Sequence, residues 1–424
     1  GCGRARERPA VAPALMGSCM LAAMSMRARL SLSLWLPLVL ACGDDAPATD
    51  GSATQGDASS TGTPGETTAV AETTAVAETT AVAETTAGET EGGFMVPQFG
   101  NTFTVIGTEA DGLDAPRDLE FSPEAPEQLW TFNMLIHGAV IFFDPGTEQQ
   151  TSEVRVDAYG QHFMAYVSSA AFGGNGRFAS CQESRDEWNV GPQDPDDFMG
   201  PSLWSSDLDV FAVIGQAFPP EGGVEGSHFD MLHQSPWCMG IAHEVDNVYW
   251  TMDGLMGDIV RYDFRADHGA GGGDHSDGII WRYSDLDVTR LPNIPGHMEI
   301  DHDTGMLYVV DTGANRLMRL DTASGTNTGS LPGDWDGATY EGVEGADYQL
   351  VVDGLDEPSG LALHEGRIFL SERGSGDVIA LELDGTEIER MSTPASDIMG
   401  ITIGPAGDLW YVDATANEVV RVDP

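Results

Sequence analysis

One sequence pattern occurs six times between residue 94 and the C-terminus. The clearest copies are residues 296–321, 358–384 and 398–423, and looser copies start at residues 116, 162 and 236. Each copy holds a short apolar strand, a polar turn, a second strand with an aromatic residue near its start, another turn and a third strand. Alternating apolar residues between turns of Gly, Asn and Asp are typical of antiparallel hairpins. A repeat of this length predicts a propeller or a solenoid.

Two columns of residues recur in phase in the six copies. The aromatic column near the start of the second strand is Trp130, Phe178, Tyr249, Tyr308, Phe369 and Trp410. The column at the end of that strand is Asn133, Cys181, Met252, Asp311, Glu372 and Asp413. Six aromatic residues in one phase are hard to obtain by chance, so we interpret the copies as equivalent structural units.

Fourth strands complete this pattern, and they are predicted at residues 152–158, 210–216, 278–284, 347–353 and 386–392. The last copy has none before the chain ends at Pro424, whereas an unpaired strand at residues 102–107 precedes the first copy. We expect this N-terminal strand to pair into the last blade and close the ring, which removes open sheet edges. The predicted fold is therefore all-β: a six-bladed β-propeller of residues 94–424 with four antiparallel strands per blade.

The best-preserved copies also resemble a known family. The segments GMLYVVDTGANRLMRLD (residues 305–321) and GDLWYVDATANEVVRVD (residues 407–423) resemble the NHL-repeat propellers, in which each repeat is one blade. The resemblance covers roughly residues 100–424. It implies a fold and leaves the function open, because propellers include both binding modules and enzymes.

The N-terminal part of the chain has a different composition. Arg27 and Arg29 precede an apolar run that is typical of a secretory signal and too short for a membrane span. A small residue directly before Cys42 resembles a bacterial lipoprotein signal, in which this Cys is lipidated; an ordinary cleaved signal is the alternative. Residues 43–93 repeat the motif ETTAVA and contain no aromatic residue, so they cannot bury enough apolar area to fold.

These features predict three parts: an upstream segment and lipoprotein-type signal over residues 1–42, a disordered stalk over 43–93, and the propeller. They predict a protein of the bacterial cell envelope, held to a membrane by lipid and facing the periplasm or the exterior.

Charge narrows the range of partners. The formal net charge is −49, and the chain contains no lysine. So acidic a protein argues against nucleic acid and against an anionic membrane surface as partners. The absence of lysine excludes Schiff-base chemistry through a Lys side chain and the Lys of a phosphate-binding loop. Cations, cationic ligands and protein partners remain open.

In such propellers, ligand sites usually lie on the face formed by the loop before each first strand and the turn after each second strand. We call this face the mouth. The residues expected to line it and to contact a ligand are Arg117, Trp237, Asp253, Glu372 and Arg373.

Four histidines are candidate metal ligands near the mouth: His162, His228, His233 and His297. Zinc or copper needs about three N or S ligands. The arrangement resembles that of peptidylglycine amidating lyases, six-bladed propellers in which histidines from separate blades hold zinc. The positions of His162 and His297 within their repeats do not match cleanly, and solvent-facing loop histidines are the alternative.

Two further sites concern cysteine and aspartate. Cys181 and Cys238 are expected on the same face of adjacent blades, which favours a disulfide; copper or zinc ligation is the alternative. The Gly-rich loop at residues 263–280 could bind calcium through Asp267, Asp274 and Asp277, although it matches no standard calcium-loop spacing. An exposed flexible loop without a metal is the other interpretation.

Two functions are compatible with these observations, and the sequence leaves open whether the protein is an enzyme. The first is a monomeric, membrane-anchored module that binds a protein, peptide or small molecule through its mouth. The second is a metal-dependent hydrolase or lyase, similar to the amidating lyases or to lactonases, in which a His-bound metal activates water. Gluconolactonase-type propellers carry an acidic residue at the start of the first blade, where this chain has Arg117, and that departure weakens the lactonase interpretation.

Overall fold

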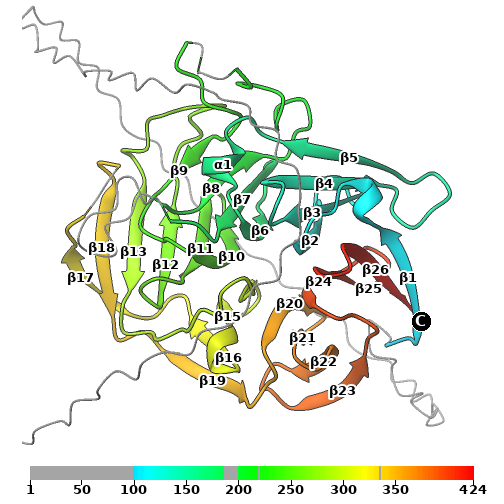
Figure 1. The fold of residues 1–424 in the computed structure, drawn as a ribbon. Coiled ribbons are helices and arrows are strands. Elements are labelled where there is room, and N and C mark those ends of the chain that lie inside the picture. The colour runs from blue at the N-terminus through cyan, green and yellow to red at the C-terminus, as the bar shows by residue number, and fades with distance from the viewer. Residues whose placement is uncertain (1–98, 186–198, 218–219, 221, 334–335) are drawn as a thin grey trace, which may run out of the picture. The chain divides into compact units, whose positions relative to one another are not determined.

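The computed structural model describes residues 99–185, 199–217, 220, 222–333 and 336–424. These residues form a six-bladed β-propeller, which confirms the predicted fold (Figure 1). The predicted signal, Cys42 and the stalk lie outside the described residues. Within the described ranges, no helix is long and apolar enough to cross a membrane.

The first three blades follow one another along the chain. Blade 1 contains β2 (Pro116–Phe121), β3 (Gln128–Asn133), β4 (Gly138–Phe143) and β5 (Thr151–Val156). Blade 2 contains β6 (Val167–Phe172), β7 (Arg177–Gln182), β8 (Ser202–Ser205) and β9 (Asp230–Met231). Blade 3 contains β10 (Cys238–Val245), β11 (Val248–Asp253), β12 (Asp258–Asp263) and β13 (Ile279–Tyr283).

The last three blades complete the ring. Blade 4 contains β14 (Met298–Asp301), β15 (Met306–Asp311), β16 (Arg316–Asp321) and β19 (Tyr348–Asp353). Blade 5 contains β20 (Pro358–His364), β21 (Arg367–Glu372), β22 (Asp377–Glu382) and β23 (Glu387–Ser392). Blade 6 contains β24 (Ile398–Ile403), β25 (Leu409–Asp413) and β26 (Glu418–Asp423) and is completed by β1 (Thr102–Gly107).

The ring closes as predicted. Strand β1 pairs antiparallel with β26, with Val105 opposite Val420, so the N-terminal strand supplies the outermost strand of the last blade. The buried Ile106 packs with Val419 and Trp410 in the core between blades 6 and 1. Closure therefore pairs the edge that β26 would otherwise expose.

The first strands of the six blades, β2, β6, β10, β14, β20 and β24, surround the axis, each next to the first strand of the neighbouring blade. Apolar side chains fill the spaces between adjacent blades; one such cluster joins Trp130 and Phe132 of blade 1 to Phe178 and Trp204 of blade 2. A disulfide between Cys181 and Cys238 ties β7 to β10, with 5.3 Å between their Cα atoms, which confirms the predicted pairing. The six blades are thus fixed around one central channel.

Blade 3 carries two strands that were not predicted, β17 (Thr326–Ser330) and β18 (Thr339–Glu344). They come from the connection between β16 and β19 of blade 4. Strand β18 runs parallel to β13, with Ile280 opposite Tyr340, and extends the sheet of blade 3 to six strands. The hairpin covers the outer edge of β13, which would otherwise present unpaired backbone groups.

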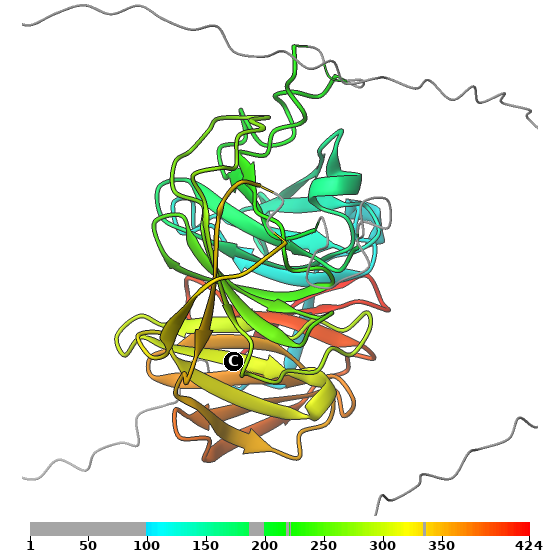
Figure 2. The same ribbon diagram turned by 90° about the vertical axis from the view of Figure 1, so that its left-hand side faces the viewer.

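The predicted fourth strand of blade 2 at residues 210–216 is wrong. This segment forms turns, in which the N–H groups of Val210 and Phe211 bond to the carbonyl of Asp207. Phe211 is fully buried and anchors the segment in the core, whereas Val213 is 51% exposed. The fourth strand is β9, farther along the chain, and Figures 1 and 2 show the green segment after β8 projecting outward beyond blade 2.

The predicted residue columns are also shifted by one position in blades 2 and 3. Strand pairing makes Gln182 and Asp253, not Cys181 and Met252, equivalent to Asn133 at the end of the second strand. A shift of one residue places every side chain on the other face of a strand. Cys181 and Met252 are therefore core residues, fully buried between blades.

The polar residues of this column have a structural role. Asn133, Asp311, Glu372 and Asp413 each accept a hydrogen bond from a backbone N–H of the loop that leads into the first strand of their own blade. In two of the following turns, Asn315 and Asn417 adopt the left-handed conformation and accept an N–H from the next blade. Side chains of this column thus hold the turns on the mouth face together.

Candidate functional site

The predicted mouth is largely occupied by ion pairs. Arg117 is fully buried, and its guanidinium lies 2.8 Å from a carboxylate oxygen of Glu183. The same carboxylate also pairs with Arg290, whose guanidinium lies 4.5 Å from the ring centroid of Trp237. Because these residues come from different blades, the network joins the blades near the axis on the side where the first strands begin.

The other predicted mouth residues are similarly engaged. Asp253 is fully buried and lies 2.8 Å from Arg282, which also pairs with Asp258. Glu372 pairs with Arg390, and Arg373 pairs with Glu357 and Asp397. The charges that the sequence assigned to ligand binding are thus neutralised within the protein.

A cavity lies on the axis and extends toward the opposite face, where the first strands end. We call it the axial chamber; it has a volume of about 220 Å³ and is lined by side chains from β2, β6, β10, β14, β20 and β24 and from the loop after β14. Its carboxylates are Asp118, Glu120 and Glu299. Most of the surface that lines the chamber is polar, and Phe121, Phe172 and Ile401 supply part of its apolar remainder; among the described residues lining it there is no arginine.

Two of the chamber carboxylates connect blade 1 to blade 2. Asp118 accepts hydrogen bonds from the backbone N–H groups of Leu119 and Ala170, both at 2.8 Å. Glu120 accepts one from the N–H of Phe172 at 3.1 Å. First strands of adjacent blades have no regular ladder between them, so these side chains satisfy N–H groups of β6 that face the channel.

The chamber raises the pKa of all three carboxyls. For Asp118, burial outweighs the favourable charge of His297, whose Nε2 lies 3.5 Å from its carboxylate. For Glu120, burial and the charges of Asp118 and Glu299 raise the pKa well above its usual range. Burial and then the charge of Asp118 raise the pKa of Glu299 to about 8. The three groups interact, so they titrate together, and of the three Glu299 holds its proton at neutral pH.

Histidines stand on both sides of these carboxyls. His297 is buried in the channel, and His243 and His302 lie toward its open end with their ring centroids 6.2 Å apart. Burial lowers the pKa of His243, whose Nε2 is hydrogen-bonded to the carbonyl of Asp246 at 3.0 Å. His297, a predicted metal ligand, thus belongs to the axial chamber.

The other three predicted histidines lie together in a second cavity, at the outer edge of blades 2 and 3. We call it the histidine cavity; it has a volume of about 260 Å³ and is lined by His162, His228, His233 and His275. His228 and His233 flank β9, the outermost strand of blade 2, so this segment does not overhang the axis as expected. His275 was not predicted as a ligand, because it lies in the Gly-rich loop of blade 3.

Hydrogen bonds orient three of these histidines. Nδ1 of His228 lies 2.8 Å from the carbonyl of Glu225, and its ring stacks on Phe163 with 3.6 Å between the centroids. Burial lowers the pKa of His228 to about 3, so it is neutral at physiological pH. Nδ1 of His233 contacts Asp336, and Nδ1 of His275 contacts Asp230. An acceptor on Nδ1 fixes the ring orientation, as it does for many metal-binding histidines.

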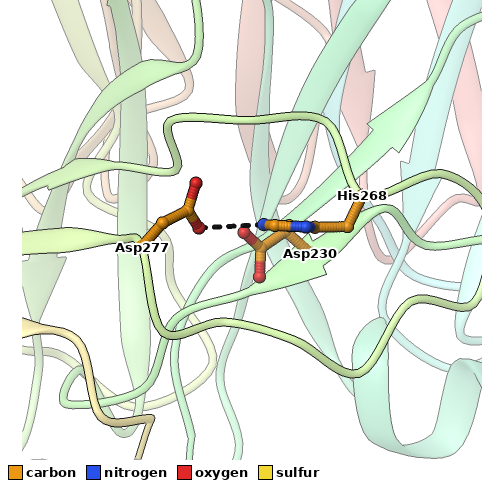
Figure 3. A group of neighbouring side chains, drawn as sticks. All are labelled: Asp230, His268 and Asp277. Carbon is orange, nitrogen blue, oxygen red and sulfur yellow. Dashed lines mark hydrogen bonds and ion pairs between the residues drawn. The ribbon is translucent and has the colours of Figure 1, made fainter. Parts of the chain in front are cut away.

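The three Asp of the predicted calcium loop point to different partners. Asp267 pairs with Arg177, and Asp274 accepts hydrogen bonds from Ser276. Asp277 lies 2.8 Å from Nε2 of His268. One ligand atom each of Asp230, His268 and Asp277 lie within 4.8 Å of one another, and this is the single such group among the described residues (Figure 3).

Comparison with known proteins supports the fold. No known protein family matches the sequence, and no curated protein does. An auxiliary nutrient binding protein from Bacteroides ovatus ATCC 8483 has a TM-score of 0.51 and 11% identity, with 77% of each chain covered.

Two further solved structures are less similar. An auxiliary nutrient binding protein from Bacteroides thetaiotaomicron VPI-5482 has a TM-score of 0.49 and 11% identity over 73% of this chain and 68% of its own. Regucalcin, a calcium-binding protein from Agrobacterium tumefaciens str. C58, has a TM-score of 0.40 and 16% identity over 76% of this chain and 93% of its own. At these identities the likeness concerns the propeller fold alone.

Proposed function

We propose that the protein is a ligand-binding propeller whose axial chamber binds a small organic cation of the aliphatic amine class. The observation that carries this proposal is the convergence of Asp118, Glu120 and Glu299 in the axial chamber, which has no arginine among its described lining residues. Burial raises the pKa of all three carboxyls, and neighbouring carboxylates raise it further for Glu120 and Glu299; an ammonium group would stabilise the ionised forms that this surrounding disfavours. A ligand that carries positive charge is therefore favoured over a neutral or anionic one.

The apolar part of the chamber wall favours an organic cation over a bare metal ion. Hard metal ions prefer several oxygen ligands and water, whereas this wall carries Phe121, Phe172 and Ile401. Aliphatic segments would contact these side chains, and the two aromatic rings could interact with the positive charge. At about 220 Å³ the chamber is smaller than sites for drug-sized molecules, which span roughly 300–1,000 Å³.

The cellular setting of this proposal comes from the sequence. We infer that Cys42 is lipidated and that residues 43–93 hold the propeller away from the membrane, so that the chamber samples an extracytoplasmic compartment. A globomycin-sensitive change in the size of the expressed protein tests this inference; an unchanged size would refute lipidation. A role in binding is also compatible with the fold shared with a nutrient-binding protein, although that likeness extends to the fold alone.

Calorimetric titration with 1,4-diaminobutane at pH 8 tests the proposal. We expect the unmodified chain to bind the diamine and to ignore 1,4-butanediol, a neutral molecule of similar length. Glu299→Gln removes one carboxylate from the chamber and should weaken binding at least about tenfold, which equals about 1.4 kcal/mol. Glu389→Gln is the matched control, because Glu389 is exposed on β23. Equal binding of the diol, or no effect of Glu299→Gln, would refute the proposal.

A metal-dependent hydrolase or lyase is the second candidate function, and the histidine cavity favours it. His228 is neutral and held by its Nδ1, as a zinc or copper ligand would be. His162, His233 and His275 line the same cavity, whereas His297 lies in the axial chamber. Stoichiometric zinc or copper that is lost in a His228→Ala, His233→Ala double variant would support this function, and an unchanged metal content would oppose it.

A further inference from the structure

The loop between β12 and β13, residues 264–278, folds back onto blade 2. The N–H of Gly271 donates a hydrogen bond to the carbonyl of His228 at 2.6 Å, and Asp267 pairs with Arg177. At its end, Ile279 begins β13. Gly271, Gly272 and Gly273 form part of the wall of the histidine cavity. The position of this loop therefore determines the shape of that cavity.

Three potential metal ligands meet where this loop contacts blade 2. Asp230 lies in β9, and His268 and Asp277 lie near the two ends of the loop. Figure 3 shows the carboxylates of Asp230 and Asp277 approaching the same end of the His268 ring. The group combines one buried, one half-buried and one exposed residue, so an ion could reach it from solvent.

Asp230 supplies an independent indication of a ligand. It is fully buried, and one of its oxygens accepts hydrogen bonds from the ring of His275 and from the N–H of Met231. Its other oxygen, Oδ2, is buried without a hydrogen-bond partner among the described residues. A buried carboxylate oxygen without a partner is costly. A cation beside Asp230 would supply the missing interaction.

We propose that Asp230, His268 and Asp277 bind a divalent metal ion of the zinc class, which fastens the loop at residues 264–278 to blade 2. One imidazole and two carboxylates are typical zinc ligands, and water would complete the coordination. Zinc–ligand distances of about 2.0–2.2 Å place ligand atoms roughly 3.4 Å apart. The three ligand atoms already lie within 4.8 Å of one another, so small side-chain rotations suffice.

The ligand set favours zinc over calcium. Calcium takes about 6–8 oxygen ligands, whereas this group offers two carboxylates and one nitrogen. His275 would act from the outer shell, because its Nδ1 contacts Asp230 and so orients that carboxylate. The group therefore differs both from the predicted calcium loop, which lacked His268 and Asp230, and from the predicted four-histidine site.

Zinc at this position would hold Gly271 to Gly273 as a wall of the histidine cavity, because His268 and Asp277 flank them in the loop. The metal would thus stabilise the loop without itself contacting a small molecule bound in that cavity. This role goes beyond the proposed amine binding, because the axial chamber and this group share no residue.

Calorimetric zinc titration of the full chain, first stripped of metal with a chelator, tests the proposal together with metal analysis by mass spectrometry. We expect one zinc per chain at this site. His268→Gln and Asp277→Asn should each weaken zinc binding by more than about tenfold. Loss of an outer-shell partner already weakens metal binding by at least about tenfold, and these two residues would contact the metal directly. Asp274→Asn, in the same exposed loop, is the matched control and should bind zinc normally.

Hydrogen exchange distinguishes a loop clamp from adventitious binding. Zinc should slow amide exchange across residues 264–278 in the unmodified chain and in Asp274→Asn, and it should have no effect in Asp277→Asn. The proposal is overturned if zinc does not bind, if zinc binding persists in His268→Gln and Asp277→Asn, or if only His228→Asn abolishes it. Glu299→Gln should bind zinc normally, so failure of this proposal and failure of amine binding give different results.

Discussion

Glu299→Gln should change the pH dependence of stability in a defined direction. Burial and the charge of Asp118 raise the pKa of Glu299 to about 8, from a usual value of 4.5. A carboxyl whose pKa is higher in the folded state contributes its full stability below the unfolded pKa and loses it as the pH rises through the folded pKa. The unmodified protein should therefore lose stability between about pH 5 and pH 8, and Gln, which remains neutral, should remove this loss.

The size of the effect follows from the number of protons involved. One proton retained by the folded state is worth about 1.4 kcal/mol per pH unit. Between pH 5 and pH 8 the upper limit is therefore about 4 kcal/mol for Glu299 alone. Glu299 is half-buried in a channel that water can enter, so we expect about 1–3 kcal/mol, since solvent reduces charge repulsion.

Thermal unfolding of the unmodified chain, Glu299→Gln and Glu389→Gln at both pH values measures this effect. We expect the unfolding midpoints of all three to agree closely at pH 5. At pH 8, Glu299→Gln should unfold at a temperature several degrees higher than the other two. The reasoning is refuted if Glu299→Gln and the unmodified chain lose stability in parallel between pH 5 and pH 8.

Three further predictions concern the scaffold. Replacing Cys181 and Cys238 by Ala should lower the free energy of unfolding by about 4 kcal/mol, because the disulfide closes a loop of 57 residues in the unfolded chain. A chemical-denaturation curve unchanged from that of the unmodified protein would contradict this prediction. Arg282→Met should cost about 3–5 kcal/mol, because it leaves the buried carboxylate of Asp253 unpaired; adding Asp253→Asn should recover part of that loss in the same assay. Deleting residues 99–107 should expose the edge of β26 and cause aggregation, measured by light scattering, and a monodisperse, equally stable chain would oppose this account of ring closure.

The propeller could be predicted because each blade carries its own local signals. Asn315 and Asn417 occupy left-handed positions at the end of the turn between the second and third strands, directly before the third strand of their blade. The strand at residues 102–107 could be assigned because the last blade lacked a fourth strand. In these cases the local pattern and the tertiary pairing agree.

Blade 2 could not be predicted in the same way. Its fourth strand, β9, has two residues, too few for a periodic pattern, whereas residues 210–216 alternate like a strand and are held in turns by the burial of Phe211. The hairpin of β17 and β18 belongs to the connection between two strands of blade 4, but it pairs with β13 of blade 3. No local pattern in the sequence indicates this contact.

The sequence does carry a signal for the axial chamber. Asp118 and Glu120 are two residues apart in β2, so they lie on the same face of a first strand. Two acidic residues on one face of a first strand could have indicated the chamber, although their meeting with Glu299 depends on the ring. The group of Asp230, His268 and Asp277 had no such signal, because it depends on the path of the loop across blade 2.

The most direct test of amine binding is the number of protons released when 1,4-diaminobutane binds at pH 7. Calorimetric titration in two buffers of different ionisation enthalpy gives this number. Because the pKa of Glu299 is raised to about 8, this carboxyl holds a proton at pH 7, and the chamber should release about one proton when the diamine enters. Glu299→Gln should release fewer. Binding without proton release, or an equal release from Glu299→Gln, would contradict the assignment of the axial chamber as the amine site.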